Sequence, residues 1–262
     1  DGVLNTSGTL TVRDVDLVDT VSATVESVRV GGTFDGTLPG ADFKGMLSVA
    51  MKPSSANPDE TGNLAWTFDS GAANAFDFLA KDETLQLAYT VQVTDDSGAT
   101  SGEITTDVHT VLVTVTGTND TPEITTVIDD FGFEEAADAS AQTLEQTGTL
   151  AFADVDDTDL IRVSSAVQAQ ATWSGGTLEA GLKQTIEDGL TIGGDGLAAP
   201  GSVNWSYKVD AADLDFLGAG ETVTLTYRVS VTDDSGVNPA SGSNEVDTAF
   251  QDVTVTITGT ND

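Results

Sequence analysis

Ser7-Gly-Thr-Leu-Thr-Val-Arg-Asp-Val-Asp16 is the stretch that decides the fold, because it returns later in the chain as Thr147-Gly-Thr-Leu-Ala-Phe-Ala-Asp-Val-Asp156. Three further blocks recur in the same order: Gly62-Asn-Leu-Ala-Trp-Thr-Phe68 as Gly201-Ser-Val-Asn-Trp-Ser-Tyr207, Thr94-Asp-Asp-Ser-Gly98 as residues 232–236, and Thr116-Gly-Thr-Asn-Asp120 as residues 258–262. Self-similarity over a long, nearly constant period indicates repeated structural units. The sequence therefore predicts two tandem modules, residues 1–122 and 123–262.

The two copies differ in how they begin. The second has residues 123–146 ahead of its repeat block, whereas the first has only six residues before Ser7. We therefore expect the first module to lack its opening strand, and both ends of the sequence look like cuts from a longer array. Each copy also carries a long insert, at residues 31–63 and 173–202, for which an additional binding role stays open.

Alternation of apolar and polar residues is the main secondary-structure signal. It runs through residues 85–93 and 223–231, and again through 111–115 and 253–257. A period of two predicts strands with one buried face, and Gly-rich turns separate them. The only marked helical signal is a short amphipathic piece at 178–187. The predicted fold class is all-β, with two tandem cadherin- or immunoglobulin-like Greek-key β-sandwich modules.

Charge limits the choice of partner. The chain has 9 Lys and Arg against 43 Asp and Glu, a net charge of −34, so it repels nucleic acid and anionic lipid and favours cations. It has no Cys, which excludes disulfides and thiolate metal sites. No apolar run is long enough to span a bilayer, and no signal peptide opens the sequence. We expect a monomeric fragment without nucleic-acid partners or membrane insertion.

Acidic residues gather directly after the alternating runs, in loops at strand ends. In an immunoglobulin-like topology, the loop at 14–19 and the loop after Thr94 lie at the end where the chain enters the module. The Thr-Gly-Thr-Asn-Asp motif leaves from the opposite end, so the exit of module one should meet the loops of module two. The candidate metal ligands are Asp14, Asp16, Asp19, Asp95, Asp96, Asn119, Asp120, Glu134, Glu135, Asp154, Asp156, Asp159, Asp233, Asp234, Asn261 and Asp262.

The chemistry of these ligands favours Ca²⁺. Calcium takes about 6–8 oxygen ligands in flexible geometry, and Asp-x-Asp spacing directs two carboxylates toward one ion. Zinc prefers nitrogen or sulfur ligands, and magnesium demands tighter octahedral geometry. Any single Asp in such a loop is equally well explained by turn formation. The joint recurrence of three acidic motifs in both copies favours the calcium interpretation.

The repeated blocks, together with Glu83-Thr-Leu85 and Tyr-Thr-Val-x-Val-Thr-Asp-Asp after it, resemble the VCBS repeat. This is a cadherin-like module found in long arrays in giant secreted bacterial adhesins of the repeats-in-toxin type. The resemblance covers most of both modules. It implies extracellular extender modules on the bacterial cell surface, calcium at the junctions between adjacent modules, and a role in adhesion or biofilm formation. Inserts of the length seen here depart from the family pattern.

An enzyme is the first alternative. The only His is His109, and its repeat counterpart is Gln251, so a catalytic His would exist in one module alone. Paired carboxylates could serve a glycosidase, but here they recur at strand ends in both copies without an evident aromatic cleft. The sequence therefore predicts a protein that is not an enzyme.

A carbohydrate-binding or other ligand-binding module is the second alternative. Trp66 and Trp205 occupy equivalent positions in alternating runs, which predicts core anchors. Trp173 aligns with Arg29 of the first copy and lies beside Gly175-Gly176. An exposed Trp there could stack on a sugar, whereas packing of the insert is the simpler expectation.

Overall fold

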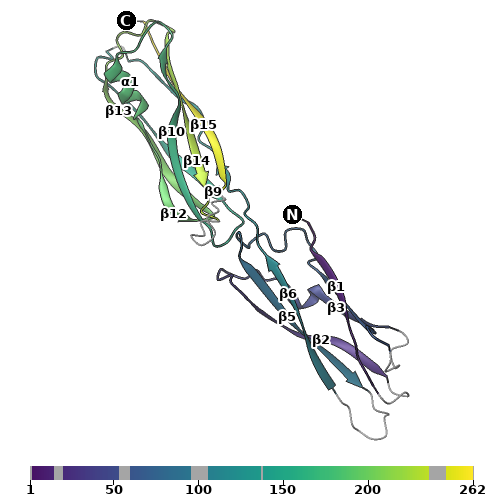
Figure 1. Ribbon diagram of the computed structural model, residues 1–262. Helices are drawn as coiled ribbons and strands as arrows, with labels where there is room; N and C mark the ends of the chain where they lie inside the picture. The colour runs from purple at the N-terminus through teal and green to yellow at the C-terminus, as the bar shows by residue number, and fades with distance from the viewer. Residues whose placement is uncertain are drawn as a thin grey trace. The chain divides into compact units, whose positions relative to one another are not determined.

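We analysed a computed structural model of the chain (Figure 1), which describes residues 2–14, 20–52, 60–95, 106–136, 138–235 and 246–261. The chain divides into two compact units, Asp1–Thr118 and Asn119–Asp262. The division falls before the predicted boundary after Pro122. Asn119 and Asp120 form their side-chain and backbone hydrogen bonds with residues of the second unit, which explains the difference.

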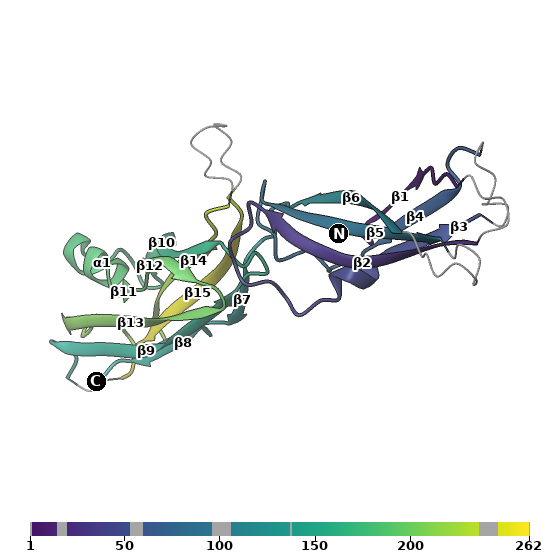
Figure 2. The same ribbon diagram turned by 90° about the horizontal axis from the view of Figure 1, so that it is seen from below.

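Unit 1 is a sandwich of two three-stranded sheets, with strand orders β1-β4-β3 and β2-β5-β6 (Figure 2). Every pairing within these sheets is antiparallel. Its elements are β1 (Asn5–Leu10), β2 (Val21–Gly32), the 3₁₀ helix η1 (Phe43–Met46), β3 (Leu47–Met51), β4 (Leu64–Asp69), β5 (Thr84–Asp95) and β6 (Thr106–Thr116).

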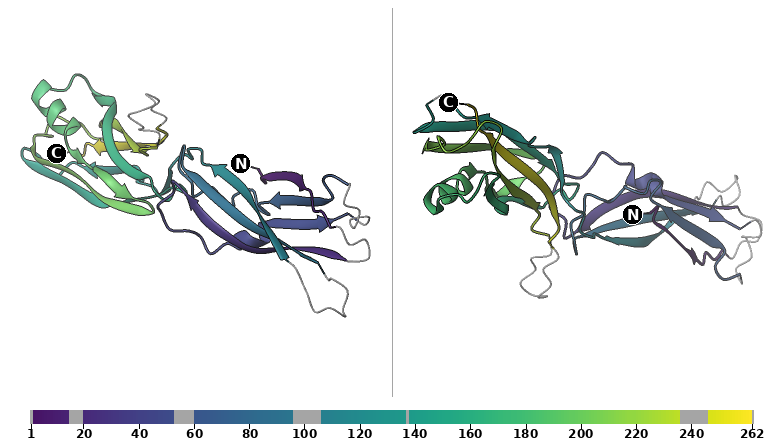
Figure 3. Two further views of the ribbon diagram at one scale, coloured as in Figure 1. Left: turned by 60° about the horizontal axis from the view of Figure 1, so that its bottom comes forward. Right: turned by 90° about the horizontal axis from the view of Figure 1, so that it is seen from above.

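Unit 2 has the same arrangement with more strands. Its sheets have the orders β11-β13-β9-β7 and β12-β10-β14-β15-β8. Figure 3 shows its two layers from further directions. The elements are β7 (Glu123–Thr126), β8 (Phe131–Glu134), β9 (Gln142–Ala153), β10 (Leu160–Trp173), α1 (Ala180–Glu187), β11 (Leu190–Thr191), β12 (Gly194–Ala198), β13 (Gly201–Ala212), β14 (Thr222–Thr232) and β15 (Thr248–Thr258). Both units confirm the predicted all-β tandem sandwiches.

The alternating runs place the core as the sequence predicts. Every second residue of β14 is buried, and the same holds for the final part of β15. The two repeated tryptophans lie over the glycine of the repeat block. A Cβ at Gly148 would come within 2.7 Å of the Trp205 ring, and one at Gly8 within 2.6 Å of Trp66. The Gly-Thr-Leu sequence therefore recurs because only Gly leaves room for the indole.

Local differences from the predicted strands have identifiable causes. The predicted strand over residues 8–13 ends at Leu10 as β1. Beyond it, the side chain of Asn63 accepts from the N–H of Val12 over 2.8 Å and donates to the carbonyl of Val12 over 2.8 Å, which replaces a strand partner.

The predicted helical piece at 178–187 is α1. None of the helices in the described ranges is long and apolar enough to cross a membrane.

Candidate metal centre

The acidic cluster of unit 2 comprises Asn119, Asp120, Asp154, Asp156, Asp159, Asp233, Asp234 and Asp247. It is built from two loops and the segment ahead of β7. Asp154, Asp156 and Asp159 lie between β9 and β10, while Asp233 and Asp234 follow β14 and Asp247 precedes β15. Because β9 and β14 run toward the same end of the sandwich, their loops meet there.

Hydrogen bonds tie the segment at 119–121 to these loops. The side-chain amide of Asn119 donates to Oδ2 of Asp233 over 3.2 Å, and the N–H of Asp120 donates to Oδ2 of Asp156 over 2.9 Å. The hydroxyl of Thr121 donates to Oδ2 of Asp247 over 3.0 Å. These contacts bring the repeated Asn-Asp motif beside the Asp-x-Asp and Asp-Asp motifs, as the sequence predicts.

Further bonds fix the loops to one another. The N–H of Asp247 donates to both oxygens of Asp233, over 3.1 and 3.0 Å, and the N–H of Leu160 donates to Oδ1 of Asp234 over 2.7 Å. The hydroxyl of Ser235 donates to Oδ2 of Asp159. Each carboxylate is therefore held in place by backbone or hydroxyl donors.

Burial makes the cluster electrostatically costly. Asp156 is 1% exposed, Asp233 3% and Asp159 6%. Burial, reinforced by neighbouring carboxylates, raises the pKa of Asp156 to about 8 and the pKa values of Asp154 and Asp159 to about 6. Burial also raises the pKa of Asp233. At neutral pH the carboxyl groups of the cluster are therefore partly protonated. Those that stay ionised lie close to one another in surroundings that disfavour their charge.

Several oxygens in the cluster have unused bonding capacity. Among the described residues, Oδ1 of Asn119, Oδ2 of Asp154 and Oδ1 of Asp156 are buried with no hydrogen-bond partner. A buried acceptor without a partner costs about 1–3 kcal/mol. One amide and two carboxylate oxygens are hard ligands of the kind that Ca²⁺ binds, so the donor set fits calcium.

The cluster is not a closed coordination shell. Within the described ranges, no three His, Cys, Asp or Glu side chains are already arranged to hold a metal ion. Several of the carboxylate oxygens instead accept hydrogen bonds from backbone N–H groups. In Asp154 and Asp156, one oxygen accepts such a bond and the other has no partner among the described residues.

The expected place of Glu134 and Glu135 beside Asn119 is wrong. The opening strand is split: β7 pairs with β9, and the chain then crosses to the other sheet, where β8 runs parallel to β15. It thereby reaches the opposite end, where Oε2 of Glu135 accepts from the N–H of Thr260 over 2.8 Å. Glu135 is 4% exposed and its Oε1 is buried without a partner in the described part of the chain, whereas Glu134 is exposed.

The remaining candidates belong to unit 1 or to the end of unit 2. Asp14 and Asp95 are half-buried and both line one cavity of about 400 Å³ in unit 1. Asn261 is exposed and lies three residues after the end of β15. The predicted ligands that lie outside the described residues are Asp16, Asp19, Asp96 and Asp262.

Repeat-based reasoning missed two members of the hydrogen-bonded cluster. Asp247 aligns with Thr105 of the first copy, so it never appeared as a recurring acid. Its signal lies in its position directly before β15, the strand that pairs with β14. Ser235 was overlooked because a hydroxyl carries no charge, although it is 3% exposed and bonded to Asp159.

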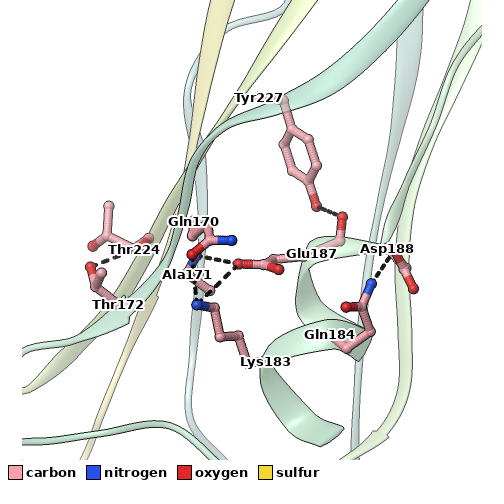
Figure 4. A network of polar contacts seen from close by, with 9 residues as sticks. All are labelled: Gln170, Ala171, Thr172, Lys183, Gln184, Glu187, Asp188, Thr224 and Tyr227. Carbon is pink, nitrogen blue, oxygen red and sulfur yellow. Dashed lines mark hydrogen bonds and ion pairs between the residues drawn. The ribbon is translucent and has the colours of Figure 1, made fainter. Parts of the chain in front are cut away.

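The second insert forms α1, whose last turn is bound into unit 2. Figure 4 shows Oε1 of Glu187 accepting from the N–H of Ala171 over 2.8 Å, with Lys183 paired to the same carboxylate at 3.9 Å. The hydroxyl of Tyr227 donates to the carbonyl of Glu187 over 2.9 Å, and that of Tyr207 donates to Ile186 over 3.2 Å. These contacts attach α1 to β10, β13 and β14 of unit 2.

Trp173 packs within unit 2. Its indole N–H donates to Oε2 of Glu221 over 3.0 Å, and its ring lies edge-on to Phe216 with centroids 4.7 Å apart. The strand register also shows which residue of unit 1 corresponds to Trp173. Trp173 pairs with Val223 of β14, and the equivalent pair in unit 1 is Gly32 with Leu85 of β5. The expected alignment with Arg29 is therefore wrong.

Comparison with known proteins gives only distant similarities. No protein-family model matches the chain, and no curated protein is significantly similar to it. Among solved structures, the chain is similar to human mucin-like protocadherin EC1-2, with 14% identity, a TM-score of 0.34 and 98% of each chain covered. It is also similar to CfaE, the adhesive subunit of CFA/I fimbria of enterotoxigenic Escherichia coli, with 10% identity, a TM-score of 0.37, and 81% and 72% of the two chains covered. Mouse cadherin-23 EC22-24 gives 15% identity and a TM-score of 0.34, with 97% and 60% covered.

Proposed function

We propose that the chain is a pair of calcium-binding extender modules from a large extracellular bacterial adhesin, of the kind that the VCBS resemblance implies. The observation that carries the proposal is the set of buried, unpartnered oxygens of Asn119, Asp154 and Asp156 in one cluster. A divalent cation would satisfy these oxygens and neutralise carboxylates whose pKa values burial has raised. Calcium suits the oxygen-only donor set.

The position of Asn119 in the chain links this site to the connection between units. Gly117 is held in unit 1, because its N–H donates to Glu83 over 2.8 Å and its carbonyl accepts from Asp82 over 3.2 Å. Asn119 is bonded in unit 2 to Asp233. In the sequence, only Thr118 lies between these two residues, so an ion bound at Asn119 would act directly next to the connection.

A restrained linker is what a spacer needs. An array of sandwiches with stiff connections holds a distal binding domain away from the cell, whereas free rotation at each connection would let it collapse. The net charge of −34 gives a second reason for calcium, since self-repulsion of this size disfavours compaction unless cations reduce it. Long arrays of such modules would therefore adopt an extended shape only where calcium is available.

Small-angle scattering of the 262-residue chain tests this role. Calcium should give a longer and narrower distance distribution than chelator, and Asp154→Ala combined with Asp156→Ala should abolish the change. Asp252→Asn, on an exposed carboxylate paired with Arg228, is the matched control and should behave as the parent. Identical distributions in calcium and chelator would contradict the extender function.

Carbohydrate binding is the alternative function. The packing of Trp173 on Phe216 and its bond to Glu221 give that side chain a structural role, and no observation in the described residues favours a sugar site over it. The calcium-dependent spacer is therefore the function that we put forward.

A further inference from the structure

In unit 2, β8 and β15 are parallel neighbours, although β8 lies near the start of the unit and β15 is its last strand. Phe131 lies opposite Val255, and Glu134 lies opposite Thr258. β8 is the outermost strand of its sheet, and Figure 2 shows it beside β15. Among the described strands of unit 2, the other pairings are antiparallel. The early and the final part of the unit are therefore joined directly to each other.

Side-chain bonds reinforce this pairing where β8 begins. The N–H of Ile128 donates to Oε1 of Gln251 over 3.1 Å, and the side-chain amide of Gln251 donates back to the carbonyl of Ile128. The N–H of Thr254 donates to Oδ1 of Asp130 over 2.7 Å. The two segments are therefore already bonded to each other before the strand pairing starts at Phe131.

Further bonds reinforce the pairing where β8 ends. The N–H of Glu135 donates to the carbonyl of Thr258 over 2.9 Å. The N–H of Thr260 donates to Oε2 of Glu135 over 2.8 Å, and the hydroxyl of Thr260 donates to the carbonyl of Glu135 over 3.3 Å. Residues 128–135 are thus bonded to residues 251–260 along the whole segment.

Apolar packing also holds β8 in place. Ile128 is 3% exposed. Phe131 stacks on Trp205 with ring centroids 5.4 Å apart, and Phe133 stacks on Tyr207 at 5.7 Å. Both partner rings belong to β13 of the opposite sheet. Sliding β8 along β15 would pull these side chains out of their contacts, so burial opposes the movement together with the hydrogen bonds.

The parallel direction decides how the two strands respond to tension. The chain enters β8 at one end of the pair and leaves β15 at the other end, so tension along the chain pulls the strands past each other. All bonds between the strands are then loaded at the same time, whereas pulling both strands from one end breaks the bonds one after another. On its other side, β15 is paired with β14 along its whole length. The contact with β8 is therefore the shorter of the two pairings of β15.

We propose that the contact between β8 and β15 is a mechanical clamp, which keeps unit 2 folded while tension acts along the chain. The clamp comprises the two strands and the side chains of Ile128, Asp130, Glu135 and Gln251. This role rests on the proposed function, because a spacer that holds a distal domain away from the cell carries tension through each module. The acidic cluster at the ends of β9 and β14 contributes none of the bonds of the clamp, so calcium binding and the clamp can be tested separately.

Single-molecule pulling of the full 262-residue chain in millimolar calcium tests the direction of load. The chain has no Cys, so handles can be attached at introduced ones. Val127→Cys, at a position 57% exposed and directly ahead of Ile128, combined with a Cys appended after Asp262, loads the two strands in shear. Val127→Cys combined with Phe250→Cys, at a position 61% exposed, loads the same contact from one end. At one constant force, the first opening step should be at least about fivefold slower in shear, because several bonds must break together. Equal rates in the two directions would overturn the proposal.

Substitutions then test the bonds of the clamp. Asp130→Ala and Gln251→Ala should each raise the opening rate in shear at least about fivefold, whereas Asp130→Asn keeps an acceptor oxygen for Thr254 and should behave as the parent. Tyr227→Phe is the control, because it weakens the attachment of α1 outside the clamp. It should lower the free energy of unfolding in urea without changing the rate in shear, since a contact that is still intact when the clamp breaks does not affect that rate. A rate increase in Tyr227→Phe as large as that in Asp130→Ala, or none in either clamp variant, would contradict the proposal.

The clamp and the calcium-dependent spacer fail in different ways. Handles at Val127 place the acidic cluster and β7 outside the loaded segment, so the pulling result does not depend on calcium affinity. A flat calcium titration together with a rate that depends on direction would remove the calcium-dependent spacer and support the clamp. Calcium-dependent scattering together with equal rates in both directions would remove the clamp alone.

Discussion

Within unit 2, the N–H of Asp120 donates to Oδ2 of Asp156 over 2.9 Å, while Oδ1 of the same carboxyl is buried with no partner among the described residues. One oxygen of Asp156 therefore anchors the segment that follows unit 1, and the other is left for a further ligand. This division of roles makes Asp156 the most informative residue of the acidic cluster.

Asp156→Asn should change stability in opposite directions with and without calcium. The amide removes a charge that burial disfavours, so the metal-free protein should gain about 1–3 kcal/mol in its free energy of unfolding at pH 8. Calcium affinity should fall at least about tenfold, because a carboxylate ligand is lost. Urea unfolding in chelator and in millimolar calcium measures both effects. Asp252→Asn should leave calcium affinity unchanged, and a loss of metal-free stability in Asp156→Asn would count against the account.

Acidification should stabilise the metal-free protein. The pKa of Asp156 in the folded protein is about 8, above its ordinary value of 3.8, and those of Asp154 and Asp159 are about 6. Between these limits the folded state binds more protons than the unfolded chain, so stability falls as pH rises from about 4 to 8. Thermal unfolding in chelator should show Tm decreasing over this range for unit 2. A Tm that rises steadily from pH 4 to 8 would contradict the predicted charge repulsion.

Calcium binding at pH 7 should release protons. The ion requires ionised carboxylates, whereas the raised pKa of Asp156 leaves that group largely protonated in the metal-free state. Titrations in two buffers of different ionisation enthalpy should therefore differ in apparent binding enthalpy, and the difference should become much smaller in Asp156→Asn. Equal enthalpies in both buffers for the parent protein would show that the carboxyls are already ionised.

Tyr227→Phe should lower the stability of unit 2. The hydroxyl donates to the carbonyls of Ile186 and Glu187, both over 2.9 Å, and these carbonyls end α1. Removing it leaves buried acceptors with fewer donors at a cost of about 1–2 kcal/mol. Chemical unfolding measures the change, with Tyr89→Phe in unit 1 as a comparison, since that hydroxyl donates to Phe43 over 2.8 Å. An unchanged midpoint for Tyr227→Phe would show that α1 is not held by this bond.

Trp173→Ala separates packing from sugar binding. Because the indole packs on Phe216 and donates to Glu221, its loss should destabilise unit 2 by about 2–4 kcal/mol. Trp173→Phe, which keeps most of the ring contact, should lose less. Saturable binding to a glycan that Trp173→Ala abolishes at unchanged stability would favour the carbohydrate-binding alternative instead.

Much of the fold and half of the candidate site follow from the repeat. Blocks that recur in order locate the strands, and the acids after them locate Asp154, Asp156 and Asp233, because strand ends on one side of a sandwich meet. Glu135 was misplaced because the sequence does not show that the opening strand crosses between sheets and ends at the opposite end. Asp247 was missed because its role depends on strand pairing, which no local pattern records.

Isothermal titration calorimetry of metal-stripped protein with calcium tests the central claim most directly. We predict saturable binding in preference to magnesium, and its loss in the chain carrying both Asp154→Ala and Asp156→Ala, while Asp252→Asn binds as the parent does. At about 100 times the dissociation constant, each site should add about 2.7 kcal/mol to the free energy of unfolding. A flat calcium titration of the folded parent chain would contradict the account.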